Sequence, residues 1–211
     1  MDRLYPILDV TLCRERALDP LAVLDAFLAG GARFIQLRDK SGSSADRLAL
    51  ADALVARVHA AGGRLIVNDR PDIARLSGAD GVHLGQDDMS AEDARQVVGA
   101  EAIVGVSTHD DEQIERAAVT SATYIAVGPI YGTSTKDTGY TARGLDLVRA
   151  AARTGRPIVA IGGITLERAP DVIAAGAWSV AVISELLRDD PERMVRRFRE
   201  RLGPEAAERV V

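Results

Sequence analysis

Short apolar runs alternate with longer amphipathic segments along the whole 211-residue chain. Runs such as AIVGV, YIAV, PIVAI and SVAVI are rich in β-branched residues and lack the polar alternation of a half-exposed strand. Continuous apolar runs of this length are typical of parallel strands, which are buried on both faces. The pattern predicts strands at Leu4–Leu8, Arg33–Leu37, Arg64–Asn68, Gly81–Leu84, Ile103–Ser107, Tyr124–Gly128, Pro157–Ile161 and Ser179–Ile183.

The segments between these strands have the spacing of helices. Asp19–Gly30 places apolar residues three and four positions apart and ends in two glycines, and Ser43–Ala61 repeats this pattern. Ser90 is followed three residues later by Asp93, which resembles a capping box and predicts a helix start. Further helices are predicted to begin at Asp110, Gly144, Leu166 and Pro191.

Strands that alternate with helices predict an α/β fold with a parallel sheet. Eight units in 211 residues leave roughly 26 residues for each, close to the smallest unit that can close a barrel. We therefore expect one (β/α)8 barrel, a TIM barrel, over residues 1–211, with a polar tail at about 203–211. An open doubly wound sheet is the alternative, but no GxGxxG follows the first strand.

Charge and composition exclude several classes of partner. The net charge of -5 argues against general binding to nucleic acid or to an anionic membrane. There is no stretch of about 18 uncharged apolar residues, so no membrane span is expected. Cys13 is the single cysteine. Because there is only one, an internal disulfide and a cysteine-rich zinc site are excluded, and a cytoplasmic location is expected. A homo-oligomer is compatible with this composition.

The candidate chemistry lies where the predicted strands end, because active sites of such barrels lie at that face. The second strand ends in Gln36, Arg38 and Lys40, which alternation places on one face. An amide and two cations at a barrel mouth can bind an anion such as phosphate. The structural alternative is a solvated basic rim.

Acidic residues follow the next two strands. Asn68 and Asp69 end the third strand, and Asp87 and Asp88 follow the fourth. Two carboxylates beside a basic cluster suit Mg²⁺, which completes its shell with water and substrate phosphate. A helix cap and a loop salt bridge are the structural alternative for Asp69 and Asp88.

The remaining strand ends are neutral and rich in glycine and hydroxyl groups. Ser107 ends the fifth strand, a loop ending in Lys136 follows the sixth, and Gly162-Gly163 and Ile183-Ser184 follow the last two. Loops seven and eight form the usual phosphate site of these barrels, although a plain tight turn is the alternative. Among the histidines we expect structural roles for His59 and His83, while His109 at a strand end stays a candidate.

These residues predict two anion sites across one barrel mouth. The first is basic and assisted by Mg²⁺, and its size suits a diphosphate; the second is built from backbone and suits a monophosphate. Such a pair favours a reaction that joins a diphosphate ester to a phosphorylated nucleophile and releases pyrophosphate.

The motifs QLRDK, VND, GVHLGQDD, GVSTH, GPIYGTSTK, IGGI and VIS run in this order from residue 36 to residue 184. In this order and spacing the chain resembles the thiamine phosphate synthase family. The resemblance implies a transferase of thiamine biosynthesis that couples a hydroxymethylpyrimidine diphosphate to a thiazole phosphate. One departure is Gly132-Thr133, where the family often has Pro-Thr.

The resemblance also assigns roles to individual residues of this chain. Asp69 and Asp88 would hold Mg²⁺, and the leaving group would be neutralised by this ion and by the catalytic residues Arg38, Lys40 and Lys136. Ser107 would be a further catalytic residue. The pyrimidine diphosphate would be bound by Gln36, Leu37, Arg38, Asp39, Lys40, Asn68, Ser107 and Lys136. The thiazole phosphate would be bound by Thr133, Ser134, Thr135, Gly163, Ile183 and Ser184.

Three other functions are compatible with such a barrel. Thiazole tautomerases share it, but they tend to lack parts of the diphosphate set, and some have histidine in place of Pro129. A barrel that only senses thiamine precursors would not need Asp69, Asp88 and Lys136. An isomerase or lyase acting on sugar phosphates would need a general-base carboxylate or a Schiff-base lysine inside the barrel, and neither is evident in the apolar strand runs.

Overall fold

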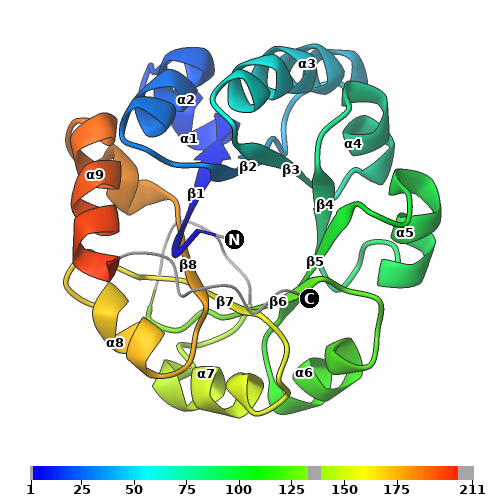
Figure 1. The fold of residues 1–211 in the computed structure, drawn as a ribbon, viewed down its shortest axis with the longest axis vertical. Helices are drawn as coiled ribbons and strands as arrows, with labels where there is room; N and C mark the ends of the chain where they lie inside the picture. The colour runs from blue at the N-terminus through cyan, green and yellow to red at the C-terminus, as the bar shows by residue number, and fades with distance from the viewer. Residues whose placement is uncertain (1, 133–138, 204–211) are drawn as a thin grey trace.

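Eight parallel strands close into a barrel in the computed structural model, which describes residues 2–132 and 139–203 (Figure 1). Each strand pairs with the next in sequence, and β8 returns to pair with β1. The predicted (β/α)8 barrel is therefore confirmed. The strands are β1 Leu4–Asp9, β2 Phe34–Arg38, β3 Arg64–Asn68, β4 Gly81–Leu84, β5 Ile103–Thr108, β6 Tyr124–Val127, β7 Ile158–Ile161 and β8 Ser179–Val182.

Helices surround the barrel as an outer ring (Figure 1). Their first turns are capped by side chains at several starts, including Ser43, Ser90 and Asp110. The helices are α1 Val10–Glu15, α2 Pro20–Ala29, α3 Ser44–Ala60, α4 Pro71–Ser77, α5 Ala91–Val98, α6 Asp111–Ala118, α7 Gly144–Ala152, α8 Ala169–Ala174, η1 Ser184–Leu187 (a 3₁₀ helix) and α9 Pro191–Leu202.

The predicted strands agree with the observed ones to within one residue at each end. The helix predictions missed α1, α4 and η1, which are short, and placed the start of α8 at Leu166. That helix begins at Ala169, where Pro170 occupies its first turn. Proline suits this place because it has no N–H to pair and its φ is already helical.

The core has two layers, one inside the barrel and one between the strands and the helices. The inner layer contains three aromatic rings, of Tyr5, Phe34 and Tyr124, whose centroids lie 4.5 to 6.2 Å apart. Gly105 makes room for this cluster, because a Cβ there would lie 2.1 Å from Cζ of Tyr124. The outer layer is mainly aliphatic, with Phe27 and Phe198 as its buried aromatic residues, and it includes Leu37 and Cys13.

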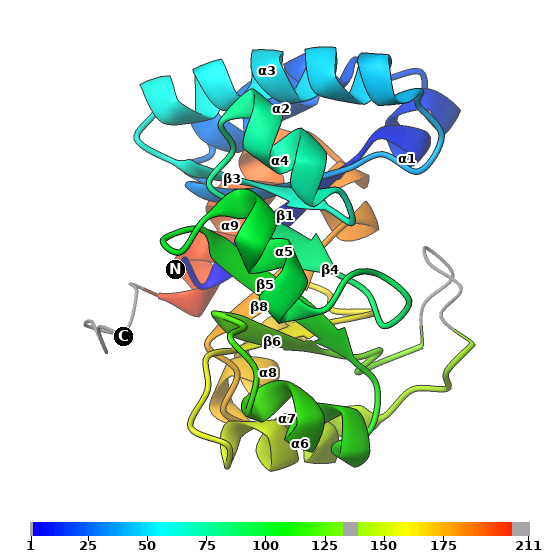
Figure 2. The same cartoon turned by 90° about the vertical axis from the view of Figure 1, so that its right-hand side faces the viewer.

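The carboxyl ends of the strands all lie at one end of the barrel. In the side view of Figure 2, α1 and the described residues after β6 lie at this end, and the start of β1 lies at the opposite end. Helix η1 follows β8 at the same place in the chain as the short extra helix of many phosphate-binding barrels. No helix among the described residues is long and apolar enough to cross a membrane.

Candidate functional site

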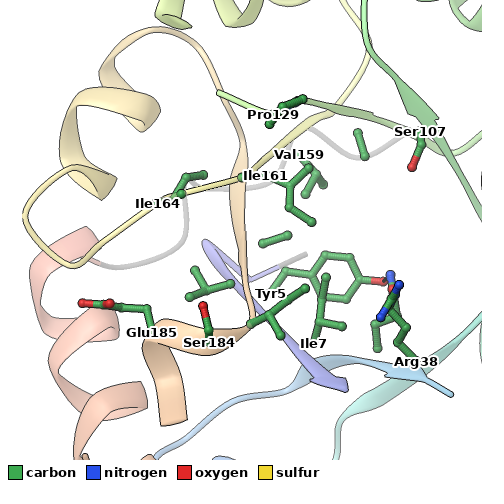
Figure 3. A pocket seen from close by; sticks show the side chains of 18 of the residues that line it. Tyr5, Ile7, Arg38, Ser107, Pro129, Val159, Ile161, Ile164, Ser184 and Glu185 are labelled. Atoms are coloured by element: carbon green, nitrogen blue, oxygen red, sulfur yellow. Dashed lines mark hydrogen bonds between the residues drawn. The ribbon is translucent and has the colours of Figure 1, made fainter. Parts of the chain in front are cut away.

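A cavity of about 280 Å³ opens at the carboxyl ends of the strands (Figure 3). Its walls are apolar in the middle, with Ile7, Val159 and Ile161. In Figure 3, Arg38 and Ser107 lie on one side of this apolar middle and Ser184 on the other. The cavity thus has two polar ends. Of the predicted site residues, Gln36, Arg38, Asn68, Ser107, Gly163, Ile183 and Ser184 line it.

The first polar end is organised by an ion pair that was not predicted from the sequence. Arg38 Nη1 contacts Oδ2 of Asp9, whose side chain is only 2% exposed. The same carboxylate accepts a hydrogen bond from the backbone N–H of Leu12 at 3.0 Å and so caps α1. Asp9 therefore fixes the Arg38 guanidinium at the cavity wall. The other N–H groups of this guanidinium can donate hydrogen bonds to an anion.

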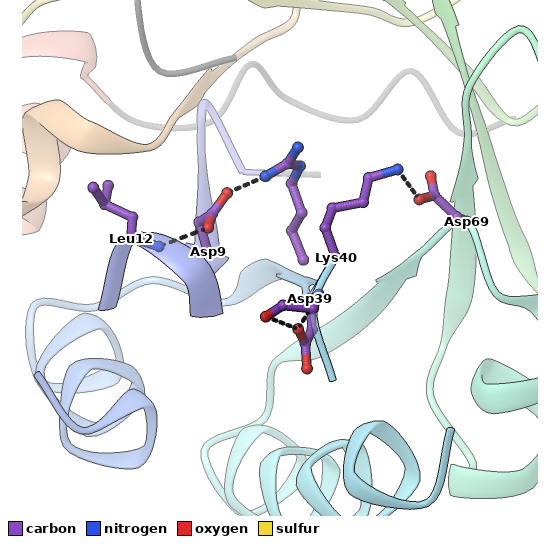
Figure 4. Close-up of polar contacts among 7 residues, drawn as sticks. Asp9, Leu12, Asp39, Lys40 and Asp69 are labelled. Atoms are coloured by element: carbon purple, nitrogen blue, oxygen red, sulfur yellow. Dashed lines mark hydrogen bonds and ion pairs between the residues drawn. The ribbon is translucent and has the colours of Figure 1, made fainter. Parts of the chain in front are cut away.

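Lys40 lies beside the two predicted metal ligands. Its Nζ contacts Oδ2 of Asp69, as Figure 4 shows. Asp69 has a φ of +64°, a left-handed conformation that is costly for a residue with a side chain and is common at functional sites. The turn after β3 therefore holds this carboxylate in a strained position next to the lysine.

Asp88 completes this acidic pair from the turn after β4. Its Oδ2 accepts a hydrogen bond of 2.7 Å from the backbone N–H of Gly85. Burial raises the pKa of Asp88, and the nearby carboxylate of Asp69 raises the pKa further, against the effect of the Gly85 N–H. The two carboxylates thus repel each other, and a cation between them would relieve the repulsion.

These two carboxylates fit Mg²⁺, which needs oxygen ligands and usually takes only one or two from protein side chains. The described residues contain no group of three or more histidine, cysteine, aspartate or glutamate side chains placed to hold a metal ion. Any ion held by Asp69 and Asp88 would thus rely on water and substrate phosphate for its remaining ligands.

Three of the described residues predicted to bind the pyrimidine diphosphate, Leu37, Asp39 and Lys40, do not line the cavity, and neither do the predicted metal ligands Asp69 and Asp88. Leu37 is 2% exposed and packs in the outer core, because strand alternation turns it away from Gln36 and Arg38. Asp39 accepts hydrogen bonds from the backbone N–H groups of Ser41 and Gly42, both at 2.9 Å. Figure 4 shows Asp39 pointing away from Lys40 and Asp69, which is consistent with a role in shaping the turn.

The pKa of Asp39 agrees with that structural role. Burial alone would raise this pKa, but the two backbone hydrogen bonds and the charge of Arg14 lower it below the usual value. Asp39 thus remains a carboxylate that holds the turn after β2 closed.

Ser107 and Gln36 each make a hydrogen bond to a side chain that was not predicted to belong to the site. His83 Nε2 lies 2.8 Å from Ser107 Oγ, and Gln36 Nε2 lies 3.0 Å from the hydroxyl of Tyr5. His83 was expected to be structural, yet it lines the cavity together with Tyr5. Both were missed because they lie within their strands, where the inward face cannot be assigned before the barrel is known.

The second polar end is built from the loops after β7 and β8. Gly163 has a φ of +60°, and a Cβ there would lie 2.5 Å from the carbonyl oxygen of Gly132, so only glycine fits. Ile183 and Ser184 follow β8 and lead into η1. Arg168, which was not predicted, also lines this end and donates a hydrogen bond of 3.0 Å to the carbonyl of Gly163.

Four predicted residues, Thr133, Ser134, Thr135 and Lys136, lie outside the described residues. Tyr140, which follows them in the sequence, contacts residues just after β5. The ring of Tyr140 stacks on His109, with centroids 4.4 Å apart, and Gln113 donates a hydrogen bond of 3.2 Å to the Tyr140 hydroxyl. His109, the histidine left as a candidate, lines the cavity and has Nδ1 2.6 Å from the carbonyl oxygen of Gly128.

This chain is similar in sequence to a known protein family and to curated proteins, and similar in fold to solved structures. A family model described as thiamine monophosphate synthase matches residues 4–186. The thiamine-phosphate synthase of Roseiflexus sp. (strain RS-1) is 46% identical over 194 residues, across 91% of this chain and 81% of that protein. That of Koribacter versatilis (strain Ellin345) is 44% identical over 198 residues, across 92% of each.

The fold agrees with these sequence matches. The thiamine phosphate pyrophosphorylase structure from Pyrococcus furiosus superposes with a TM-score of 0.85 at 26% identity and covers 95% of both chains. The family match over most of the chain, the identity to these relatives and the shared barrel lead to one conclusion: this chain belongs to the thiamine monophosphate synthase family.

Proposed function

We propose that this protein couples a hydroxymethylpyrimidine diphosphate to a thiazole phosphate, giving thiamine phosphate and pyrophosphate. The observation that carries the proposal is the two-ended cavity: a charged end at Arg38 and a backbone-rich end at Gly163 and Ser184 flank one apolar middle. Family membership supports the same reaction. An enzyme that handles one phosphorylated substrate would need only one such end.

The proposed reaction needs little acid–base chemistry. The bond between the pyrimidine methylene carbon and the diphosphate oxygen breaks, and its electron pair leaves with pyrophosphate. The lone pair of the thiazole nitrogen then forms a bond to that carbon, and the nitrogen becomes the cationic centre of the thiazolium ring. The protein must therefore stabilise the leaving charge and align the two rings.

The charged end supplies the stabilisation of the leaving group. Arg38 is held in place by Asp9, and Lys40 lies next to Asp69, so both cations are already positioned before a ligand arrives. Preorganised charges of this kind cost no reorganisation during the reaction. When bound by Asp69 and Asp88, Mg²⁺ would neutralise part of the diphosphate charge.

Lys136 is proposed to help neutralise the leaving group. Gln36, Asn68 and Ser107 are proposed to bind the pyrimidine diphosphate. Thr133, Ser134, Thr135, Gly163, Ile183 and Ser184 are proposed for the thiazole phosphate.

Position 129 gives no support to a thiazole tautomerase reaction, although His109 and Glu185 also line the cavity. Proton transfer requires a titratable group within hydrogen-bond reach of the thiazole, and Pro129, which lines the cavity, provides none at its position.

The proposal also includes a cytoplasmic location, which the single cysteine of the chain favours.

A crossed pair of variants tests the assignment of one substrate to each end. Arg38→Ala should raise KM for the pyrimidine diphosphate, and Ser184→Ala should raise KM for the thiazole phosphate. The loss of one neutral hydrogen bond is expected to cost about tenfold, and the loss of the guanidinium more. If each variant raised both KM values equally, the separation into two ends would be wrong.

A further inference from the structure

Five polar side chains form a continuous line of hydrogen bonds across the interior of the barrel. Gln36 Nε2 lies 3.0 Å from the Tyr5 hydroxyl, which lies 3.1 Å from the Tyr124 hydroxyl. The Tyr124 hydroxyl lies 2.9 Å from His83 Nδ1, and His83 Nε2 lies 2.8 Å from Ser107 Oγ. The line starts and ends at two residues proposed to bind the pyrimidine substrate, and each member comes from a different strand.

The middle of this line is buried and closely packed. Tyr5 and Tyr124 are 1% and 0% exposed, and His83 is 8% exposed. The ring of His83 stacks on that of Tyr124, with centroids 5.6 Å apart and planes 16° apart. Because Tyr5 and Tyr124 are buried, we expect each hydroxyl to give its proton to a member of the line.

Both tyrosines also keep their protons. Burial raises the pKa of Tyr5 and of Tyr124 well above the ordinary value of a phenol. Each hydroxyl in the line therefore has one proton to donate and one oxygen that accepts.

The amide of Gln36 fixes the direction in which these protons point. Its nitrogen donates to Tyr5, and if each buried hydroxyl of the line donates its one proton within the line, the proton of Tyr5 points to Tyr124. The proton of Tyr124 then goes to Nδ1 of His83, which leaves the histidine proton on Nε2. Nε2 donates to Ser107, so the hydroxyl proton of Ser107 is left for an acceptor in the cavity.

We propose that Tyr5, Tyr124 and His83 are positioning residues that pass this donor direction from Gln36 to Ser107. They make the Ser107 hydroxyl a hydrogen-bond donor, so it selects a ligand atom with a lone pair, such as a ring nitrogen or a phosphate oxygen. The identity of that ligand as a pyrimidine diphosphate rests on the proposed function. The direction of the line does not rest on it.

The tautomer of His83 tests the direction without any assay of activity. The chain has only three histidines, so ¹⁵N spectra of the imidazole nitrogens are simple, and a His83→Gln variant identifies the His83 signals. At about pH 8, above the ordinary pKa of histidine, we expect the proton on Nε2 and a hydrogen-bonded, unprotonated Nδ1. A proton on Nδ1, alone or on both nitrogens, would overturn the proposal.

Two matched variants then test the order of the line. Tyr124→Phe keeps the ring that stacks on His83 but removes the donor to Nδ1, so the Nδ1 signal should move to that of a nitrogen without a hydrogen bond. Tyr5→Phe keeps the Tyr124 hydroxyl next to His83 but removes the donor that orients its proton, so a part of the His83 population should carry its proton on Nδ1, a smaller change than in Tyr124→Phe. Equal shifts in the two variants would contradict the assigned order.

A double-mutant cycle connects the line to turnover. Ser107→Ala is expected to lower kcat/KM about tenfold, the effect of one lost hydrogen bond. If Tyr124 acts only through His83 and Ser107, Tyr124→Phe should add little in the Ser107→Ala background. Fully additive losses would refute the coupling. If the unaltered protein released no pyrophosphate, the proposed function would fail, while the histidine tautomer would still decide the direction of the line.

Discussion

Replacement of Asp9 by asparagine should destabilise the protein through the loss of one ion pair. Asp9 contacts Arg38 with one carboxylate oxygen and caps α1 with the other. Asparagine is as good an N-cap as aspartate. The Asp9→Asn variant therefore keeps the cap and removes the negative charge that balances Arg38.

The expected size of this loss follows from burial. Loss of one partner of a fully buried ion pair costs about 3–5 kcal/mol, because the remaining charge is left unpaired in a medium of low polarity. The Asp9 side chain is 2% exposed, but that of Arg38 is 14% exposed and can reach some water. We therefore expect a smaller loss, about 2–3 kcal/mol in the free energy of unfolding.

Urea unfolding measures this loss. With an m value of about 2.5 kcal/mol/M, the midpoint should fall by about 1 M at unchanged m. Asp110→Asn is the matched control, because Asp110 caps α6 through a similar bond, 2.9 Å from the backbone N of Gln113. That control should change the free energy of unfolding by no more than about 0.5 kcal/mol.

The comparison of the two variants decides the interpretation. If Asp9→Asn and Asp110→Asn lowered the midpoint equally, only the capping charge would matter, and the ion pair with Arg38 would contribute nothing to stability. The same result would remove the argument that Asp9 holds the guanidinium in place.

Three further predictions concern the site and the core. Asp69→Ala and Asp88→Ala should each lower kcat about 100-fold or more and weaken the dependence on Mg²⁺, whereas Asp87→Ala should behave like the unaltered protein in a magnesium titration. If both ligand variants kept full activity, the metal assignment would be wrong. Arg38→Lys should lower kcat/KM for the pyrimidine diphosphate about 10- to 100-fold, since lysine cannot form a two-point contact; unchanged steady-state kinetics would exclude such a contact. Cys13 should react with a thiol reagent far more slowly in the native state than in urea, because it is 0% exposed and burial raises its pKa to about 11, and equal rates would show that the helix layer opens readily.

The strands could be predicted from the sequence because a parallel sheet has a strong signal. Runs such as YIAV and PIVAI are apolar at every position and end at glycine or polar residues, so their limits are visible without tertiary information. Helix α4 has a weaker signal, since its seven residues from Pro71 to Ser77 begin with proline and include three buried positions. A helix this short is stabilised mainly by packing on the barrel, which the sequence does not reveal.

The same contrast holds for the site. Gln36 and Arg38 could be predicted because alternation along one strand places them on one face, and the same alternation explains why Leu37 packs on the opposite face. Tyr5 and Asp9 share the inward face of β1, but from the sequence the first strand was predicted only as an apolar run over Leu4–Leu8. Their roles depend on neighbours on β2 and β6, which become close only when the barrel closes.

The dependence of pyrophosphate release on both substrates tests the central proposal most directly. Purified protein with Mg²⁺ and the pyrimidine diphosphate should release almost no pyrophosphate. Addition of the thiazole phosphate should start the release, with one thiamine phosphate formed for each pyrophosphate. If no pyrophosphate were released with both substrates present, or if it were released without any thiamine phosphate, the proposed coupling reaction would be wrong.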